Sequence, residues 1–194
     1  PREDVEAILN AAVQAPSAGN MTLWTIINVT DPEKKAALAK SCDNQPFIAK
    51  APLVLVFCAD CRKWYHAFLE YGCDPRKPGV GDLMLAVSDT NIAAQNAVVA
   101  AQSMGIGSCY IGDIMENAEQ HRAMLSLPPY VFPAAMLVFG YPTTQQKERT
   151  KPLRSKAVTT AGVTPEMRPA WPRVMGFTLF SFSWISRERP AMSV

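Results

Sequence analysis

The sequence predicts one layered domain of the α/β or α+β class, in which helices cover a single β-sheet. Helix-like and strand-like patterns follow one another in the order helix, strand, helix, strand, excursion, long helix, strand, helix, strand. The 194 residues provide enough chain for one substantial core. The composition, 48% hydrophobic and 19% charged, is typical of a globular protein, and neither an internal repeat nor a linker divides the chain.

The first helix is expected from Pro1 onwards, because proline followed by acidic residues suits a helix N-terminus. An apolar stripe at helical spacing continues to Val13, and the helix ends before Pro16. Pro16–Asn20 then reads as a loop rich in turn residues, and 24–29 alternates as a strand does.

The next elements are a capped helix and a buried strand. Asp31, followed by proline and glutamate, predicts the start of a helix over 33–40. The continuous apolar run from Pro52 to Cys58 predicts a strand that is buried on both faces. The irregular segment 60–82 begins with aromatic residues at partly helical spacing, and a long irregular insertion of this kind is typical of a lid near a binding site.

The stretch 83–104 predicts the central element, a long helix that is apolar on nearly every side. A helix of this kind is buried, so it needs cover from the rest of the domain or from a second subunit. Gly105 ends it, and 106–112 follows as a short strand bracketed by glycines. A core helix with a tight turn and a ligand-binding turn both fit this pattern. A short helix over 116–125 and a strand over 134–139 complete the domain.

Charge and cysteine content exclude several classes of protein. With a net charge of +2, the chain lacks the bias expected of a nucleic-acid-binding protein. We expect no signal peptide and no membrane segment, because the N-terminus opens a helix and no apolar run reaches about 20 residues. Five cysteines at irregular spacing argue against a disulfide scaffold and favour the reducing cytoplasm.

Three isolated features admit competing interpretations. Cys58 and Cys61 have the spacing of half a zinc site or of a redox pair, but no second pair completes the zinc ligands, and structural cysteines are the favoured interpretation. His66 and His121 are predicted to be surface or capping residues. The basic run from Lys147 to Lys156 fits either a solvated tail or a phosphate-binding segment.

Taken together, these segments resemble the nitroreductase family of flavin enzymes over about Pro1 to Lys156. The informative parts are the Pro-Ser-x-x-Asn loop that begins at Pro16, the Gly-x-Gly-Ser-x-x-x-Gly turn that begins at Gly105, and the Gly-Tyr-Pro sequence that ends at Pro142. They occur together with Trp24, with Asp89 and Asn96 in the long helix, and with the basic run.

The resemblance implies an α+β, three-layer fold with a central mixed β-sheet flanked by helices, assembled as a homodimer. It implies two FMN sites at the subunit interface, NADH or NADPH as the electron donor, and no metal. It also implies a set of cofactor-binding residues: Pro16, Ser17, Ala18, Asn20 and Thr22 in the loop, Tyr110, Ile111 and Gly112 in the turn, and the basic residues Lys151 and Arg154.

In such proteins the loop lies along the isoalloxazine ring and the ribityl chain, and its asparagine, here Asn20, bonds the flavin. Backbone N–H groups of the turn point at the N5 edge, and the basic residues reach the phosphate. The resemblance therefore implies that hydride passes from NAD(P)H to the flavin, and that electrons continue to a nitroaromatic, quinone or flavin-type acceptor by a ping-pong route. No side chain is assigned as catalytic.

The chain departs from the family pattern in three places. The arginine segment that grips the phosphate in relatives would precede Pro1, so we expect residues 1–157 to form the family domain without it. Thr22 and Leu23 replace the family's glutamine and proline. Residues 158–194 form a divergent tail. A flavin-binding or flavin-free dimeric module without turnover is therefore the alternative to an FMN-dependent oxidoreductase.

Overall fold

One four-stranded sheet organises residues 1–142, which is the part of the chain that the computed structural model describes. The strands lie in the order β1-β2-β4-β3, so the two long apolar strands are central and the two short ones form the edges. Their bounds are Trp24–Asn28 for β1, Leu53–Asp60 for β2, Gly107–Ile111 for β3 and Val131–Gly140 for β4.

The described strands pair only in antiparallel fashion, whereas a mixed sheet was expected. The reason lies in the connections between neighbouring strands. A pair of short helices links β1 to β2, and another pair links β3 to β4. Each pair of helices brings the chain back to the end of the sheet at which the first strand finished. The second strand therefore runs antiparallel to the first. Within residues 1–142 the expectation of a mixed sheet is wrong.

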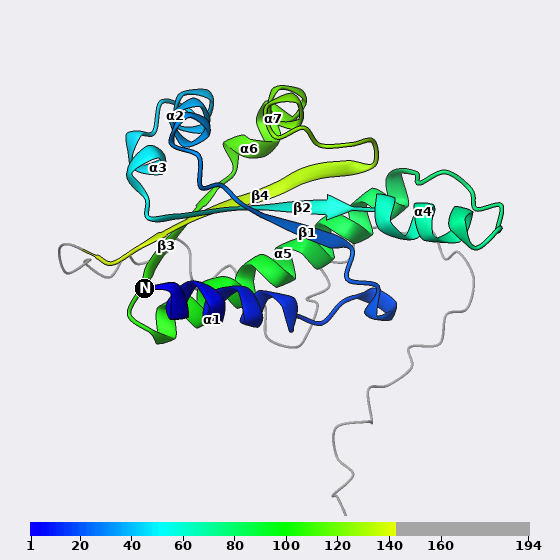
Figure 1. Ribbon diagram of the computed structural model, residues 1–194, viewed down its shortest axis with the longest axis horizontal. Helices are drawn as coiled ribbons and strands as arrows, with labels where there is room; N and C mark the ends of the chain where they lie inside the picture. The colour runs from blue at the N-terminus through cyan, green and yellow to red at the C-terminus, as the bar shows by residue number, and fades with distance from the viewer. Residues whose placement is uncertain (143–194) are drawn as a thin grey trace, which may run out of the picture. The chain divides into compact units, whose positions relative to one another are not determined.

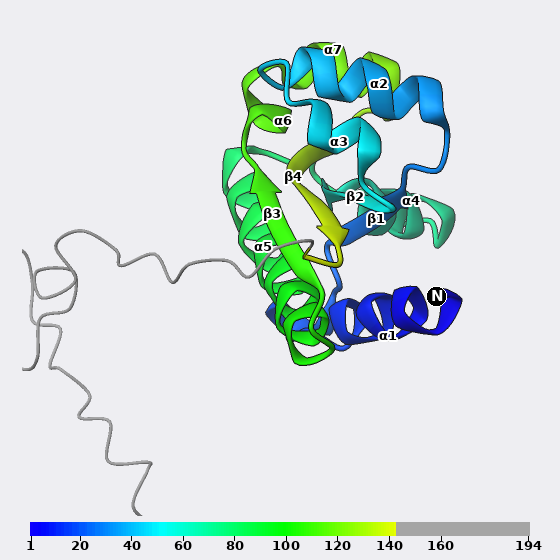
Figure 2. The ribbon, with the colours of Figure 1, turned by 90° about the vertical axis from the view of Figure 1, so that its left-hand side faces the viewer.

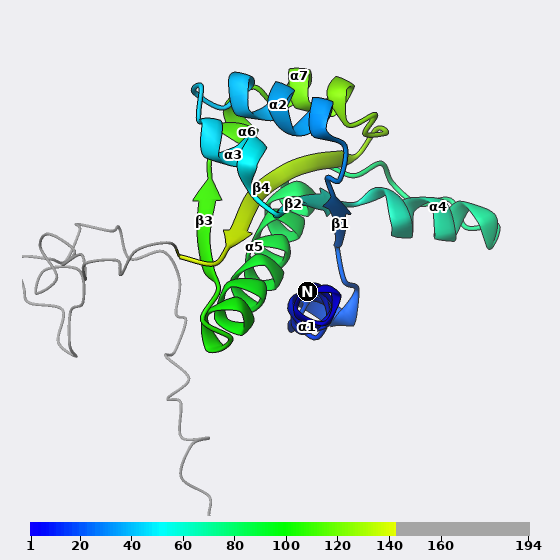
Figure 3. The ribbon, with the colours of Figure 1, turned by 60° about the vertical axis from the view of Figure 1, so that its left-hand side comes forward.

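Helices cover both faces of the sheet, which confirms the prediction of an α+β fold in three layers (Figure 1). The helices α1 and α5 lie on one face, and the short helices α2, α3, α6 and α7 lie on the other, as the turned view in Figure 3 also shows. Their bounds are Arg2–Val13 for α1, Pro32–Ser41 for α2, Pro46–Lys50 for α3, Val80–Ser103 for α5, Asp113–Glu116 for α6 and Ala118–Met124 for α7.

The central strand β2 is buried along its whole length, as predicted. Its side chains alternate between two cores, because successive residues of a strand point to opposite faces. Leu55 and Phe57 pack in the core beneath α1 and α5. Val54 and Val56 pack in the core beneath the short helices. The apolar run of β2 is continuous because helices cover both faces of the sheet, so that both sets of side chains are buried.

Several elements differ from the expected ones: α5 begins at Val80, the helix expected over 116–125 is the pair α6 and α7, and β4 and α3 differ as follows. The strand β4 begins three residues before the predicted start at 134, although Pro133 lies inside it. The register shifts opposite this proline, between Phe57 and Cys58, and such a bulge accommodates a residue that lacks an N–H. The five-residue helix α3 was not predicted, because a helix that short has no periodicity to detect.

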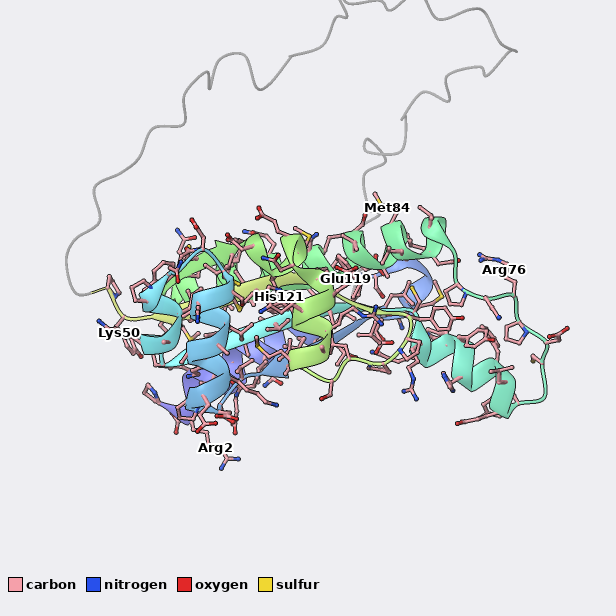
Figure 4. All side chains as sticks on the ribbon, turned by 90° about the horizontal axis from the view of Figure 1, so that it is seen from above. Arg2, Lys50, Arg76, Met84, Glu119 and His121 are labelled. Carbon is pink, nitrogen blue, oxygen red and sulfur yellow. The ribbon has the colours of Figure 1, made fainter. Side chains whose placement is uncertain are left out.

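The helix α5 corrects the prediction of burial on every side. Its buried face is made of small side chains, among them Ala86, Ala93 and Ala97, which allow the helix to lie close to the sheet. The larger apolar side chains of the opposite face are exposed, with Met84 at 61% and Val99 at 57%. Figure 4 shows Met84 directed away from the body of the described domain. The other residues of 1–142 therefore leave one face of α5 uncovered.

The predicted excursion begins with a helix, α4 (Arg62–Glu70), which projects beyond the end of β2 (Figure 1). The segment 71–79 then leads back to the start of α5. Arg76 and Asp82 join this segment to α5 through a two-point ion pair. The arginine and the N–H of Gly79 together lower the pKa of Asp82 to about 2. A lid function for this excursion stays a prediction.

His121 corrects a second prediction, since it is fully buried and not a surface or capping residue. Its Nδ1 lies 2.9 Å from the carbonyl oxygen of Ile114, and its Nε2 lies 2.8 Å from the hydroxyl oxygen of Ser41. Figure 4 shows it enclosed among the short helices. The ring links α2, α6 and α7, and this structural role explains its burial. His66 is exposed, as predicted.

Candidate functional site

The loop between α1 and β1 holds an unusual backbone. Gly19, Asn20 and Thr22 all adopt left-handed conformations, with φ of 57°, 56° and 48°. Glycine and asparagine tolerate this region, but a β-branched threonine there is an outlier. A strained non-glycine residue of this kind costs about 1–3 kcal/mol and persists only where surrounding contacts hold it. The loop is therefore a segment whose shape is imposed by its neighbours.

Contacts from within the loop and from α5 hold this shape. The hydroxyl oxygen of Ser17 accepts a hydrogen bond from the N–H of Thr22 at 3.0 Å. The N–H of Ala18 donates to the carboxylate of Asp89, at 3.0 Å to one oxygen and 3.3 Å to the other. Asp89 belongs to α5 and is buried. A buried acceptor on a rigid helix thus fixes the middle of the loop.

The helix α4 clamps the same loop from another side. The indole N–H of Trp64 donates to the carbonyl oxygen of Met21 at 2.7 Å. The ammonium group of Lys63 donates to the carbonyl oxygen of Thr22 at 3.1 Å and also to that of Trp24. Partial burial lowers the pKa of Lys63. Sequence reasoning missed both clamping residues, because nothing in their spacing shows that α4 folds back towards the loop.

The glycine-bracketed turn lies at β3, which is the edge strand at the other end of the sheet order from β1 (Figure 2). The hydroxyl of Tyr110 donates to the side-chain oxygen of Gln95 at 3.3 Å, and partial burial raises the pKa of Tyr110. Ile111 is 2% exposed, and its side chain packs in the core beneath the short helices. Gly112 is exposed and starts α6. An edge strand leaves backbone N–H and C=O groups without a partner strand.

The loop and the turn share α5 as their support. The loop is tied to it at Asp89, and the turn at Gln95. Within residues 1–142 no hydrogen bond joins the loop directly to the turn. Pro16 and Asn20 are exposed, and within this range the Asn20 side chain has no hydrogen-bond partner. Lys151 and Arg154 lie outside the described residues.

A cavity of about 340 Å³ opens beside the loop, between Met21 and the inner side of α4. Its walls are largely aromatic, with Trp64, Tyr65 and Phe68 contributing from α4. Trp64 therefore has two roles, as a wall of the cavity and as the donor that holds Met21. The aromatic residues of the excursion are visible in the sequence. The cavity is not, because it forms only where segment 75–78 returns past α4.

The paired cysteines fit the structural interpretation. Cys58 and Cys61 are both buried, and burial raises the pKa of Cys58 to about 12 and that of Cys61 above its usual value. Redox activity and metal binding both require the thiolate, which this environment disfavours. In the described range no cluster of three or more His, Cys, Asp or Glu side chains could hold a metal ion. Residues 1–142 likewise contain no helix that is both long and apolar enough to span a bilayer.

Comparisons with known proteins agree with the resemblance in sequence. The model of the Nitroreductase family matches residues 1–141. An FMN reductase (NADPH) of Bacillus subtilis is 33% identical over 142 residues, which are 72% of this chain and 57% of that protein. An oxygen-insensitive NADPH nitroreductase of Salmonella typhimurium is 36% identical over 137 residues, which are 71% of this chain and 55% of that protein.

Solved structures show the same likeness. The structure of NfrA2 from B. megaterium superposes with a TM-score of 0.80 and 30% identity, covering 87% of this chain and 69% of that one. The chain spans less than two thirds of the length of the curated relatives it matches, since it covers 57% and 55% of the two named above. The matched region contains the strained loop, α5 and the glycine-bracketed turn. The chain therefore belongs to the nitroreductase family.

Proposed function

We propose that this protein binds FMN and uses NADH or NADPH to reduce a nitroaromatic, quinone or flavin-type acceptor by a ping-pong route. The relatives named FMN reductase and nitroreductase support the reaction class. The observation that carries the proposal is the strained loop, which Asp89 and α4 hold in a left-handed shape with Asn20 exposed at its tip. FMN, when bound, supplies the hydride and electron chemistry.

The residues of the loop fit this cofactor. The amide of Asn20 offers both donors and an acceptor for the polar edge of a flavin ring. Pro16, Ser17 and Ala18 have small side chains and would let a flat ring lie along the loop, and Thr22 would add a hydroxyl. Strain of this kind is concentrated at ligand-binding sites, because a purely structural turn has no need of it.

The turn and the basic run complete the proposed set. Tyr110 and Ile111 at the end of β3, and Gly112 directly after it, would offer backbone N–H groups, because β3 has no neighbouring strand on one side within residues 1–142. Lys151 and Arg154 would hold the phosphate, for which a guanidinium offers a bidentate fork. The aromatic cavity beside Met21 would receive the planar acceptor, because its walls come from Trp64, Tyr65 and Phe68.

We also propose that the protein is a homodimer built on the exposed face of α5. Leu85, Ile92 and Val99 recur at intervals of seven residues and are 41%, 42% and 57% exposed. A seven-residue apolar repeat is typical of helices that pair with another helix. A second copy of this chain supplies such a helix by two-fold symmetry. All five cysteines are free, which fits a cytoplasmic location.

Anaerobic reduction tests the proposed activity. The protein is saturated with FMN, freed of excess cofactor, and mixed with NADH or NADPH without oxygen. We expect the flavin absorbance to bleach and to return when a quinone is added. A protein that holds FMN but is not reduced by either nucleotide would support the dimeric module without turnover. The names of the relatives favour the enzyme.

A further inference from the structure

A second cavity, of about 360 Å³, adjoins the aromatic cavity and shares the lining residues Cys61 and Pro78 with it. Val80 and Leu83 of α5 form one wall, and Tyr130 and Phe132, at the start of β4, form another. None of the residues proposed to bind the flavin lines it. Its volume falls in the range of about 300–1,000 Å³ that is usual for small-molecule sites.

Arg122 supplies the only charged side chain of this lining. Its Nε is buried and is the one buried side-chain nitrogen or oxygen in residues 1–142 without a hydrogen-bond partner. One terminal nitrogen makes a single long hydrogen bond, 3.4 Å to the carbonyl oxygen of Pro128. In the same range no carboxylate lies within ion-pair distance of Arg122. Within residues 1–142 the guanidinium is therefore a cation without a carboxylate partner, and it lines a largely apolar cavity.

The N-terminus of α5, which lines the same cavity, also favours an anion. The cavity includes Gly79 and Val80 at the N-terminus of the 24-residue helix α5, where the backbone carries partial positive charge. Asp82 belongs to the same first turn, but its carboxylate bonds Arg76 and the N–H of Gly79 and lies in the lining of the neighbouring cavity. Among residues 1–142, no carboxylate therefore lines the Arg122 cavity itself.

We propose that this cavity binds an aromatic monocarboxylate. A guanidinium can pair with a carboxylate through two parallel hydrogen bonds, and here the two terminal nitrogens of Arg122 would be the donors, because Nε is buried. The ring of the ligand would pack against Tyr130, Phe132 and Leu83. A nucleotide phosphate fits less well, because the lining contains a single cation and otherwise apolar groups. This ligand site is separate from the proposed flavin site and does not depend on it.

Calorimetric titration of the full chain with 2-naphthoate tests the proposal, and the neutral isostere 2-naphthamide is the comparison ligand. We expect the carboxylate to bind at least tenfold more tightly than the amide. The variant Arg122→Gln should lose this preference, and Arg62→Gln, which removes an exposed arginine at the start of α4, should retain it. Saturating FMN should leave the affinity for naphthoate unchanged.

Several results would overturn the proposal. Equal affinities for the two ligands in the wild type would show that charge is not recognised. Competition between FMN and naphthoate would place the ligand at the flavin loop. Unaltered naphthoate binding by a folded Arg122→Gln protein, or no binding at millimolar concentration, would remove Arg122 from any site. The comparison of the two ligands in the wild type decides the question even where the variant fails to fold.

Discussion

The buried carboxylate of Asp89 accepts the backbone N–H of Ala18 at 3.0 Å, across 71 residues of sequence. This contact joins the strained loop to the longest helix of the fold. Because the loop holds three left-handed residues, it needs an external support of this kind. The contact therefore connects the central helix to the geometry of the proposed flavin site.

Replacing Asp89 with alanine should disorder the loop and weaken FMN binding at least tenfold. The N–H of Ala18 would lose its acceptor, at a cost of about 1–3 kcal/mol in the free energy of unfolding. Asp89→Asn keeps an acceptor oxygen and should be milder. Fluorescence titration of FMN and urea unfolding measure the two effects. The adjacent Ser88→Ala serves as the control, because Ser88 is exposed and bonds only within α5. Equal affinities in Asp89→Ala and wild type would show that the loop does not bind the flavin.

Two substitutions at Asn20 separate its side chain from its backbone. Asn20→Ala and Asn20→Gly both remove the amide, but only alanine is strained at a φ of 56°. If the amide bonds the flavin, both variants should lose about tenfold in FMN affinity and remain folded. The control is Asn10→Ala on the exposed side of α1. Full affinity in the glycine variant would mean that Asn20 only shapes the turn.

A charge on the exposed face of α5 should break the proposed dimer. Ile92→Lys places an ammonium group in the middle of the apolar repeat, where pairing would bury it without a partner. Light scattering at micromolar concentration should give a dimer for the wild type and a monomer for this variant. Val13→Lys changes another exposed apolar residue, 55% accessible on α1, and should stay dimeric. A wild-type monomer would contradict the proposal directly.

Stability should fall at alkaline pH in part because of Cys58. Burial raises its pKa from 9.0 to about 12 in the folded protein. Between these values the unfolded chain releases the proton and the folded protein keeps it, so the free energy of unfolding decreases as pH rises. At pH 10.5 this amounts to at most about 2 kcal/mol.

Urea unfolding at pH 8 and pH 10.5 measures this dependence. Cys58→Ala should reduce the loss between the two pH values, and replacement of the exposed Cys109 should leave it as in the wild type. Part of the loss remains in Cys58→Ala, because burial also raises the pKa of Cys42, to about 11. An identical loss in Cys58→Ala and wild type would exclude the buried thiol as a source.

Arg154→Ala tests whether the basic run holds the phosphate. A charge-assisted hydrogen bond contributes about 1.5–3 kcal/mol, so FMN affinity should fall roughly ten- to hundredfold. Riboflavin lacks the phosphate and should bind both proteins about equally. Titration of both flavins into both proteins provides the comparison. Unchanged FMN affinity would assign the basic run to solvent.

The predictable parts of the structure are those with local signals. The apolar run of β2 and the helix cap at Asp31 each depend on residues that are adjacent in sequence. The Asp31 carboxylate, for example, accepts the N–H of Glu33 at 2.9 Å. The loop containing Asn20 was located by its motif, but its support was not. Contacts of Lys63 and Trp64 with the loop span about 40 residues, and no short-range pattern encodes them. The burial of His121 likewise depends on three helices that meet only in the folded chain.

Equilibrium titration of the 194-residue chain with FMN, followed by flavin fluorescence, shows whether the strained loop is a cofactor site. We expect saturable binding with one FMN per chain, and weaker binding when Asp89 is replaced by alanine. Absence of saturable binding would contradict this expectation, and so would an affinity that is indifferent to the contact between Asp89 and Ala18.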